Sequence, residues 1–175
     1  MGDSSTTKPN AIAAYTVAVL HHANKYLLLR RAETKRFAPG LWTGIGGLVE
    51  PHELNALHSA ALREIFEETG IASSSISLLV LRRVLLLHNR PGSSLTILLY
   101  FTGSLHTPAL PNCTEGTLAW IAPEQLPLLK FIDNDQLVIP LLIEDQERDP
   151  TGVEPIHLGI AHYNSNGKLE RIVWV

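Results

Sequence analysis

Three glutamates crowd the short segment "ALREIFEETG" (61–70), although only 18% of the residues in the chain are charged. If the segment is a helix, Glu64, Glu67 and Glu68 fall within an arc of roughly 100°, and its apolar side chains occupy a different arc. Like charges at these spacings each cost about 0.2–0.5 kcal/mol, and the helix dipole disfavours anions in the last turn. Either this face is a solvated surface, or its carboxylates bind a hard divalent cation such as magnesium.

Glycines and cations flank the glutamates. The segment "GIGG" (44–47) comes directly before them, and glycines let a backbone carbonyl or amide approach a ligand without a Cβ in the way. Further upstream lie four basic residues that could meet phosphates: Arg30, Arg31, Lys35 and Arg36. Carboxylates, glycines and nearby cations together indicate metal-assisted attack on a polyphosphate.

The segment "GGLVEPHELNALHSAALREIFEETGI" (46–71) resembles the Nudix box, whose pattern is G-x5-E-x7-R-E-U-x-E-E-x-G-U, with U a bulky aliphatic residue. Gly47 and Glu53 match its first part, and residues 63–71 match every specified position of its last part. Nine residues separate Glu53 from Arg63 where the family has seven, and the family spacing leads back to Asn55. Two residues are therefore inserted in the loop or in the first helical turn.

The resemblance implies a hydrolase that uses magnesium or manganese to cleave a nucleoside diphosphate linked to another moiety. By position, Glu64, Glu67 and Glu68 would hold the metal together with the backbone carbonyl of Gly47, or that of Gly46. Arg63 would act in catalysis by orienting a glutamate through a salt bridge. In the family, the glutamate at the position of Glu53 supports the loop and the start of the helix more than it does chemistry.

Two sources of the general base stay open. In some members of the family it is a glutamate of the box, here Glu64 or Glu67, and in others it lies on a later loop. The segment "CTEGTLAWIAPEQLP" (113–127) resembles that later part, in which a glutamate precedes a tryptophan by five residues, as Glu115 precedes Trp120. The alternative for Glu115 is an ordinary acidic residue of a loop.

The segments "KRFAPGLWTGIGGLV" (35–49) and "LPLLKFIDNDQLVIPLL" (126–142) resemble the branch of the family that hydrolyses oxidised purine nucleoside triphosphates. The resemblance gives Phe37 as an apolar pocket wall and Thr43 as a base contact. Asn134 and Asp135 stand where that branch has two acids that read the purine edge. An asparagine offers both a donor and an acceptor and could still do so. The alternative for both residues is a helix N-cap, and the two roles can coexist.

The pattern of the whole chain predicts an α+β fold with a mixed sheet, a central catalytic helix and a second helix near residues 134–146, which is the α/β/α sandwich of the Nudix fold. We expect the first helix to run from about Glu53 to Thr69 and to end at Gly70, and Pro140 to kink or split the second. Arg82 and Arg83 should alternate across a strand, so at most one could face a substrate. Strands are expected at 11–22, 26–32, 76–89, 94–105 and 116–122, with turns at 24–25 and 90–93 and a last hairpin around 166–167.

The composition fits one domain over residues 11–175 after a flexible tail at 1–10. A net charge of −3 excludes a broad basic surface for a nucleic acid polymer. The single cysteine, Cys113, excludes an intrachain disulfide and suits a reducing compartment. Without a secretory h-region or an apolar run long enough for a membrane span, we expect a cytoplasmic protein, monomeric or homodimeric, with no membrane partner.

Three functions are compatible with these observations. The first is a magnesium-dependent pyrophosphohydrolase that converts a nucleoside triphosphate, for example the oxidised purine 8-oxo-dGTP, to a monophosphate and pyrophosphate. The second is a hydrolase of ADP-ribose or another molecule that contains a nucleoside diphosphate. The third is a non-catalytic ligand sensor with the same fold, and the presence of all three box glutamates argues against it.

Overall fold

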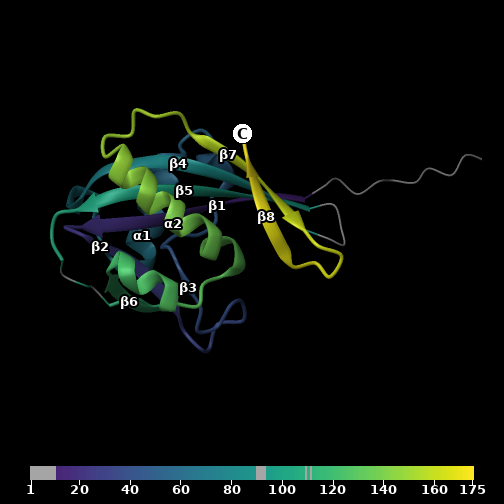
Figure 1. Cartoon of the computed structure of the whole chain (residues 1–175). Coiled ribbons are helices and arrows are strands. Elements are labelled where there is room, and N and C mark those ends of the chain that lie inside the picture. Colours follow the sequence, from purple (N-terminus) through teal and green to yellow (C-terminus); the bar gives the residue numbers. More distant parts are fainter. Residues whose placement is uncertain (1–10, 90–93, 109, 111) are drawn as a thin grey trace, which may run out of the picture.

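The computed structural model of the chain describes residues 11–89, 94–108, 110 and 112–175. The predicted tail at 1–10 and the predicted turn at 90–93 lie outside the described residues. Figure 1 shows a single sheet with helices packed on it. Its strands are β1 (Ala11–His22), β2 (Lys25–Arg31), β3 (Trp42–Thr43), β4 (Ile76–Asn89), β5 (Ser94–Leu105), β6 (Gly116–Ile121), β7 (His157–Tyr163) and β8 (Leu169–Trp174). The helices are α1 (Leu57–Thr69) and α2 (Asp133–Arg148), with 3-10 turns at Pro51–Glu53, Ser73–Ser75 and Pro123–Leu128.

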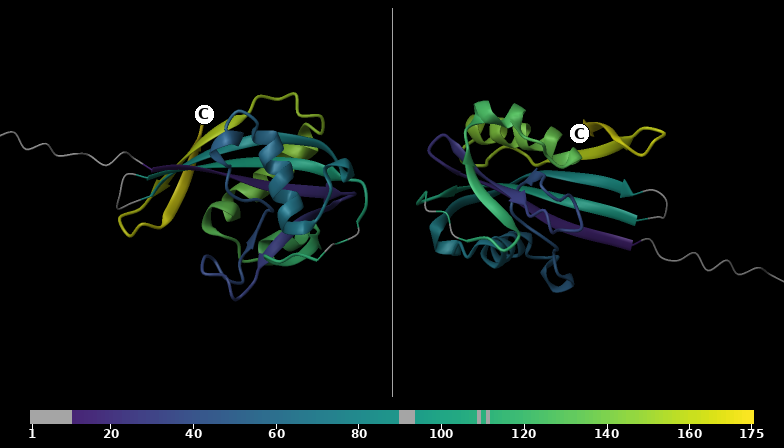
Figure 2. Two further views of the ribbon diagram at one scale, coloured as in Figure 1. Left: turned by 180° about the vertical axis from the view of Figure 1, so that it is seen from behind. Right: turned by 90° about the horizontal axis from the view of Figure 1, so that it is seen from below.

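The sheet is mixed. Its strand order is β3-β2-β1-β5-β4-β7-β8, and β6 also pairs with β2. The β1–β5 and β4–β7 pairs are parallel and the other pairs antiparallel. One apolar core lies between the sheet and α1 and the other between the sheet and α2, and Figure 2 shows the two helices on opposite faces of the sheet. The predicted α+β sandwich is therefore confirmed.

All five strands predicted from the sequence are present. The long strands β4 and β5 have the predicted bounds, because runs rich in leucine, valine and isoleucine fit a pleated sheet buried on both faces. The first hairpin turns at Ala23 and Asn24, one residue before the predicted turn, since His22 pairs with Lys25. In the last hairpin, Asn164 Oδ1 accepts the backbone N–H groups of residues 166 and 168, which confirms the predicted turn.

Helix α1 begins at Leu57, so the prediction that it starts near Glu53 was wrong. The backbone of Ala56 is not helical (φ −143°, ψ 49°), and the 3-10 turn Pro51–Glu53 precedes it. The exposed residues 54–56 between the turn and the helix accommodate the two inserted residues. The predicted end is confirmed, because Gly70 has a left-handed conformation (φ 71°) and donates its N–H to the carbonyl of Phe66.

Helix α2 continues through Pro140, so of the two predicted effects of this proline, a kink or a split, the split does not occur. Proline cannot donate the backbone hydrogen bond to the residue four positions earlier. Four apolar side chains around it are nevertheless buried in the core under α2, and this packing stabilises the helix on both sides of the proline. They are Val138, Ile139, Leu142 and Ile143.

Arg82 and Arg83 do not alternate across the sheet, which corrects the prediction from a regular strand. A β-bulge changes the register between Leu81 and Arg83, and a bulge places two residues of one strand opposite one residue of its partner. Both guanidinium groups are buried and bind carboxylates in or just after α2. Both arginines therefore anchor α2 to β4.

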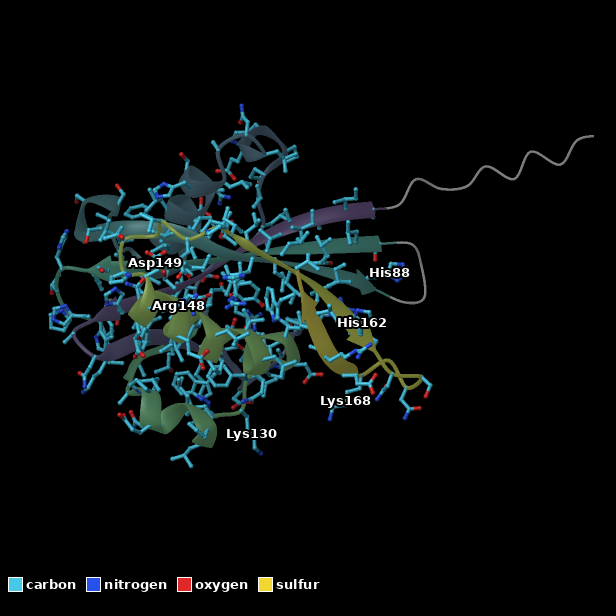
Figure 3. All side chains as sticks on the ribbon, turned by 45° about the horizontal axis from the view of Figure 1, so that its top comes forward. His88, Lys130, Arg148, Asp149, His162 and Lys168 are labelled. Atoms are coloured by element: carbon cyan, nitrogen blue, oxygen red, sulfur yellow. The ribbon has the colours of Figure 1, made fainter. Side chains whose placement is uncertain are left out.

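The contacts of both arginines are direct and buried. Arg83 donates two hydrogen bonds to Asp145, at 2.6 and 2.8 Å, and its guanidinium lies 4.5 Å from the ring centre of Trp174. Arg82 donates to Asp149 at 2.9 Å, and it also binds Gln146 and Thr102. Figure 3 shows Asp149 at the end of α2. These contacts fix the position of the helix whose first turn carries Asn134 and Asp135.

Candidate functional site

The glycine-rich segment after β3 lies against β1. Ala18 and Ile45 exchange backbone hydrogen bonds, and the N–H of Thr16 donates to the carbonyl of Gly47 at 2.9 Å. Gly46 has a φ of +153°, and a Cβ at this position would overlap the carbonyl of Thr16. The tight approach to β1 therefore requires a glycine at 46.

The carboxylates of Glu64 and Glu68 lie beside these glycines. Glu68 accepts the N–H of Gly46 at 3.1 Å, and the carboxylate of Glu64 occupies the space where a Cβ on Gly47 would lie. Burial raises the pKa of Glu68 to about 7, and the charges of Glu115 and Glu64 act in the same direction. Burial also raises the pKa of Glu64. The carboxylates of Glu64 and Glu68 are therefore both partly removed from solvent. A cation bound between them would offset the cost of burying their negative charges.

Glu67 lies in a different environment, although it belongs to the same predicted metal set. Its side chain is 57% exposed and is held by Arg63. Arg63 Nη1 donates to both Glu64 and Glu67 at 2.8 Å, and Nη2 donates to the carbonyl of Leu48 at 3.0 Å. The predicted salt bridge from Arg63 to a glutamate is therefore present, and it also ties α1 to the loop that precedes it.

Glu53 is the main partner of Arg63. Both of its oxygens accept hydrogen bonds from the guanidinium, each at 2.7 Å, and one also accepts the N–H of Glu50. The hydrogen bonds from Arg63 are the first cause that lowers the pKa of Glu53 to about 2, and the Glu50 N–H adds to them. Glu53 keeps this contact despite the inserted residues, and it supports the loop as the family resemblance implied.

The later loop brings Glu115 to the same region. Its charge acts on Glu68, and its carboxylate forms an ion pair of 2.5 Å with Lys35. The backbone of Glu115 is fixed as well, because its carbonyl accepts the N–H of Ala32 just after β2. The structure therefore brings Glu115 close to the helix glutamates, with a lysine as its partner.

The donors present fit a magnesium or manganese ion. Such ions take oxygen ligands, and magnesium is commonly held by one or two carboxylates together with substrate phosphates. Glu64 and Glu68 would supply the carboxylates, and Gly46 would supply a carbonyl, because that of Gly47 points toward β1, where it accepts the N–H of Thr16. Within the described ranges no three acidic, histidine or cysteine side chains are assembled for a metal. Arg63 and Lys35 instead hold Glu67 and Glu115.

A second polar cluster lies on the α2 side of the sheet. Asp135 is buried and accepts hydrogen bonds from Thr43 at 2.6 Å and from Tyr100 at 2.8 Å. Asn134 donates from Nδ2 to both Asp135 and Tyr100, each at 2.8 Å. Burial raises the pKa of Asp135 to about 6, and its three donors oppose that shift. Thr43, Asn134 and Asp135 are therefore brought together, as the prediction of a shared base-binding role requires.

The structure changes three details of that cluster. Neither Asn134 nor Asp135 caps α2, since the N-cap is Ile132 and no side chain caps it, so the N-cap alternative was wrong. Phe37 takes no part in the cluster; it is 65% exposed, with Arg31 over its ring. Tyr100 was missed. A tyrosine within the apolar run "TILLYF" was a signal, because a buried tyrosine hydroxyl needs a partner.

Substitution by alanine should have different effects at Gly46 and at Gly47. Gly47→Ala places a methyl group where the carboxylate of Glu64 lies, and that flexible side chain can move aside. We expect the affinity for Mn²⁺ to fall about 10- to 100-fold with little change in the free energy of unfolding. Gly46→Ala forces a methyl group against backbone in a strained conformation, and we expect it to unfold the protein. Equal destabilisation by both substitutions, measured by urea unfolding, would contradict this account.

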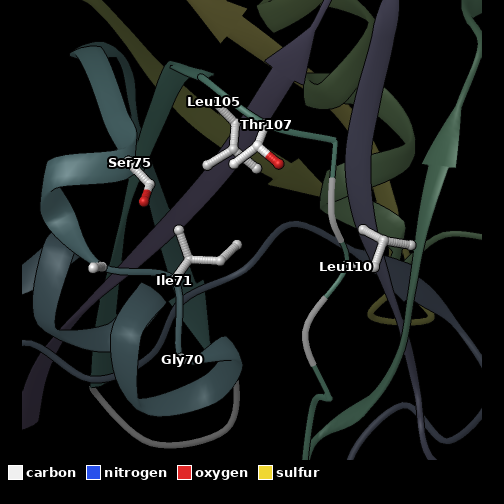
Figure 4. Close-up of a pocket in the computed structure, with 7 residues that line it drawn as sticks. Gly70, Ile71, Ser75, Leu105, Thr107 and Leu110 are labelled. Atoms are coloured by element: carbon white, nitrogen blue, oxygen red, sulfur yellow. The ribbon is translucent and has the colours of Figure 1, made fainter.

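Two hollows in the described part of the surface lie away from the carboxylates of α1. One, of about 310 Å³, lies beyond the C-terminal end of α1 and is lined mainly by apolar residues, among them Ile71 and Leu105 (Figure 4). Another, of about 360 Å³, lies between His88 and the last hairpin. Neither is lined by the carboxylates of α1.

The sequence of the chain also matches a known protein family. A model of the NUDIX domain matches residues 10–142, which is more than half of the chain. No curated protein matches the sequence. In the described part of the chain, no helix is long and apolar enough to cross a membrane.

Solved structures share the fold. The mMutator MutT protein of Bacillus halodurans is similar at 20% identity and a TM-score of 0.67, over 93% of this chain and 97% of that chain. A NUDIX hydrolase from Nitrosomonas europaea matches at 21% identity and a TM-score of 0.66, over 86% and 78% of the two chains. The NUDIX domain of Shewanella oneidensis NrtR, solved with ADP ribose, matches at 17% identity and a TM-score of 0.58, over 83% and 94%. With the box residues assembled around Gly46 and Gly47, the chain belongs to the Nudix family and is a hydrolase that acts on pyrophosphate bonds, and its fold is similar to that of MutT proteins.

Proposed function

We propose that the protein is a magnesium-dependent pyrophosphohydrolase of purine nucleoside triphosphates, with guanine-type bases, including oxidised ones such as 8-oxo-dGTP, as its preferred class. The observation that carries this proposal is the hydrogen-bonded cluster of Thr43, Tyr100, Asn134 and Asp135. Thr43 is only three residues before Gly46 along the chain, so the Cα atoms of these two residues lie within about 10 Å of each other. That separation suits a nucleotide with its base at one end and its phosphates at the other.

The hydrogen-bond donors of the cluster are used on acceptors within the cluster. Thr43 gives its hydroxyl proton to Asp135, and Asn134 uses its amide N–H groups on Asp135 and Tyr100. A flipped Asn134 amide would set its oxygen against the carboxylate of Asp135, so the orientation is determined by the network. The atoms left for a ligand, Asn134 Oδ1 and Thr43 Oγ1, are then acceptors. They favour a base edge with adjacent N–H donors, as guanine has, over adenine, which presents an acceptor beside its amino group.

The phosphates of the nucleotide would lie beside the carboxylates of α1. Glu64, Glu68 and the Gly46 carbonyl would hold the cation, which neutralises phosphate charge and lowers the pKa of bound water. Glu115 is assigned as the proton acceptor, because it is near Glu68 but is not part of the pair beside the glycines. The oxygen of water bonds to phosphorus, its proton passes to Glu115, and the bond between the α- and β-phosphates breaks to release pyrophosphate. Arg63 positions Glu64 and Glu67 rather than touching the substrate.

A nucleotide panel tests the proposal. With Mg²⁺, we expect pyrophosphate and a monophosphate from dGTP and 8-oxo-dGTP, with kcat/KM at least about tenfold higher than for dATP. Asn134→Leu should remove most of that preference while it leaves Mn²⁺ affinity unchanged. Equal turnover of dATP and dGTP by the natural protein would contradict the assignment of the base.

ADP-ribose is the second candidate substrate, because the NrtR domain with the same fold binds it. Product analysis separates the two classes, since ADP-ribose gives two monophosphates and no pyrophosphate. Hydrolysis of ADP-ribose but of no triphosphate would replace the proposed substrate and keep the reaction type. Binding without hydrolysis of any member of the panel would contradict the proposed reaction.

A further inference from the structure

We propose that Lys35 is a switch between two partners: it holds Glu115 in the nucleotide-free protein and exchanges it for a substrate phosphate, which releases Glu115 toward the cation. This inference rests on the proposed function, because it assigns a role to a residue next to the same carboxylates. It adds a phosphate ligand and a reason why Glu115 is unavailable until a nucleotide binds.

The ion pair between Lys35 and Glu115 is short, and both of its side chains are partly exposed to solvent. Lys35 Nζ lies 2.5 Å from Glu115 Oε2, and the two side chains are 31% and 27% exposed. The pairs that anchor α2 are different, since the side chains of Arg82 and Asp149 are only 5% and 6% exposed. Water can replace either partner of an exposed pair at little cost, whereas a separated buried pair leaves a charge without solvent. The pair of Lys35 can therefore exchange partners while those under α2 stay intact.

The backbone on both sides of the pair is fixed. Ala32 donates its N–H to the carbonyl of Glu115 and accepts the N–H of Lys35, so both residues are tied to the end of β2. The rest of the loop is held at its base, where Arg31 donates to the carbonyl of Phe37 and Arg30 to that of Gly40. Only the two side chains then have to move: the flexible stem of the lysine can swing its ammonium group, and the carboxylate of Glu115 can turn, without rearranging the loop.

The charges explain why the exchange would occur. Glu64 and Glu115 both act on Glu68 as like charges, and Lys35 neutralises Glu115. A nucleotide with its cation brings both signs at once: phosphate oxygens attract the ammonium group, and the cation attracts the carboxylate. The exchange leaves every charge paired.

The other upstream cations are less suited to this role. Arg30 pairs with Glu33 on the surface, and Arg31 is bound to Phe37. Arg36 is exposed, and within the described ranges it forms no ion pair. Lys35 is thus the cation of the loop that already touches a carboxylate of the site, and Arg36 supplies a control of the same charge one residue away.

The test measures binding rather than turnover. In Lys35→Met, titration of Mn²⁺ alone, followed by electron paramagnetic resonance, should show an affinity about three- to fivefold higher than in the natural protein, because Glu115 is released. Calorimetry with the α,β-methylene analogue of dGTP and Mg²⁺ should show binding about tenfold weaker, because a phosphate contact is lost. Lys35→Arg should keep both values near those of the natural protein, and circular dichroism verifies the fold of each variant.

Two further variants isolate the pair. Arg36→Met removes the same charge from the loop and should change either affinity less than about twofold. In a Glu115→Gln background, Lys35→Met should no longer raise the affinity for Mn²⁺, because there is no carboxylate to release.

The outcomes separate this inference from the function on which it rests. Mn²⁺ binding that requires Glu68 in the natural protein supports the metal site, and an unchanged Mn²⁺ affinity in Lys35→Met then overturns the switch alone. An equal gain with and without Glu115 also overturns it, since the effect would be general attraction of charge. Absence of any Mn²⁺ binding to the natural protein would overturn both the switch and the metal site.

Discussion

Glu68→Gln is expected to lower kcat about 10³-fold and, in the absence of metal, to make the protein more stable at pH 8. The loss of activity follows from the position of Glu68 beside Gly46, where its carboxylate would hold the cation. A catalytic cation supplies several kcal/mol of charge stabilisation, and each 1.36 kcal/mol of barrier is a factor of ten in rate. The gain in stability comes from the same burial that makes the carboxylate a strong ligand.

The raised pKa of Glu68 determines how the stability of the metal-free protein changes with pH. The pKa of Glu68 is about 7 in the folded protein and 4.5 in the unfolded chain. Between these values the folded protein binds more protons than the unfolded chain, so the stability of the metal-free protein falls as the pH rises from about 4.5 to about 7. Glutamine carries no such charge, and its Oε1 can still accept the N–H of Gly46. We therefore expect Glu68→Gln to be about 1–3 kcal/mol more stable at pH 8 and little changed at pH 4.5.

Urea unfolding with EDTA at several pH values measures this difference. Glu144→Gln is a suitable control, since it removes the same charge from an exposed position on α2 and should leave the pH dependence unchanged. The account of this site is contradicted if Glu68→Gln is less stable than the natural protein at pH 8, or if it keeps full activity with Mg²⁺.

Arg83→Met is expected to lower the free energy of unfolding by about 3–5 kcal/mol, because it breaks a buried ion pair. It leaves Asp145 buried, with only the half-exposed Arg148 as its partner. It also removes the stacking of the guanidinium on Trp174. Equilibrium unfolding in urea measures the loss.

The remaining folded fraction should stay active, because Arg83 contacts the C-terminal half of α2, whereas Asn134 and Asp135 lie in its first turn. Arg30→Met is the control, since its side chain is 52% exposed and its loss should change stability by less than about 0.5 kcal/mol. A similar loss from both substitutions would show that the buried contacts under α2 are not the source of the effect.

The sequence predicted the fold where local patterns agree with tertiary contacts. Strands β4 and β5 are long apolar runs and were predicted with their correct bounds. The start of α1 was not, because the 3-10 turn and the non-helical Ala56 lie within a pattern that continues to look helical. The shared face of Arg82 and Arg83 depends on a β-bulge, and no residue type in "VLRRVL" marks a bulge. The unbroken α2 reflects packing that outweighs the local effect of Pro140.

For the site, the sequence identified the residue types but not their partners. The family pattern placed Glu64, Glu68 and the glycines together, and the structure adds that Glu67 faces outward toward Arg63. It could not show that Lys35 meets Glu115, because the two residues are 80 positions apart. The same holds for Tyr100 and Asp135, whose contact depends on how α2 packs on β5. Pairings at long range come from topology, which single residues do not encode.

The most direct test of the metal site is an anomalous difference map from a crystal soaked in Mn²⁺. We expect one strong peak in contact with the carboxylates of Glu64 and Glu68 and with the carbonyl of Gly46, and no such peak in Glu68→Gln. A peak at another place on the protein, or none at a concentration that saturates activity, would contradict the claim that the glutamates of α1 form the catalytic cation site.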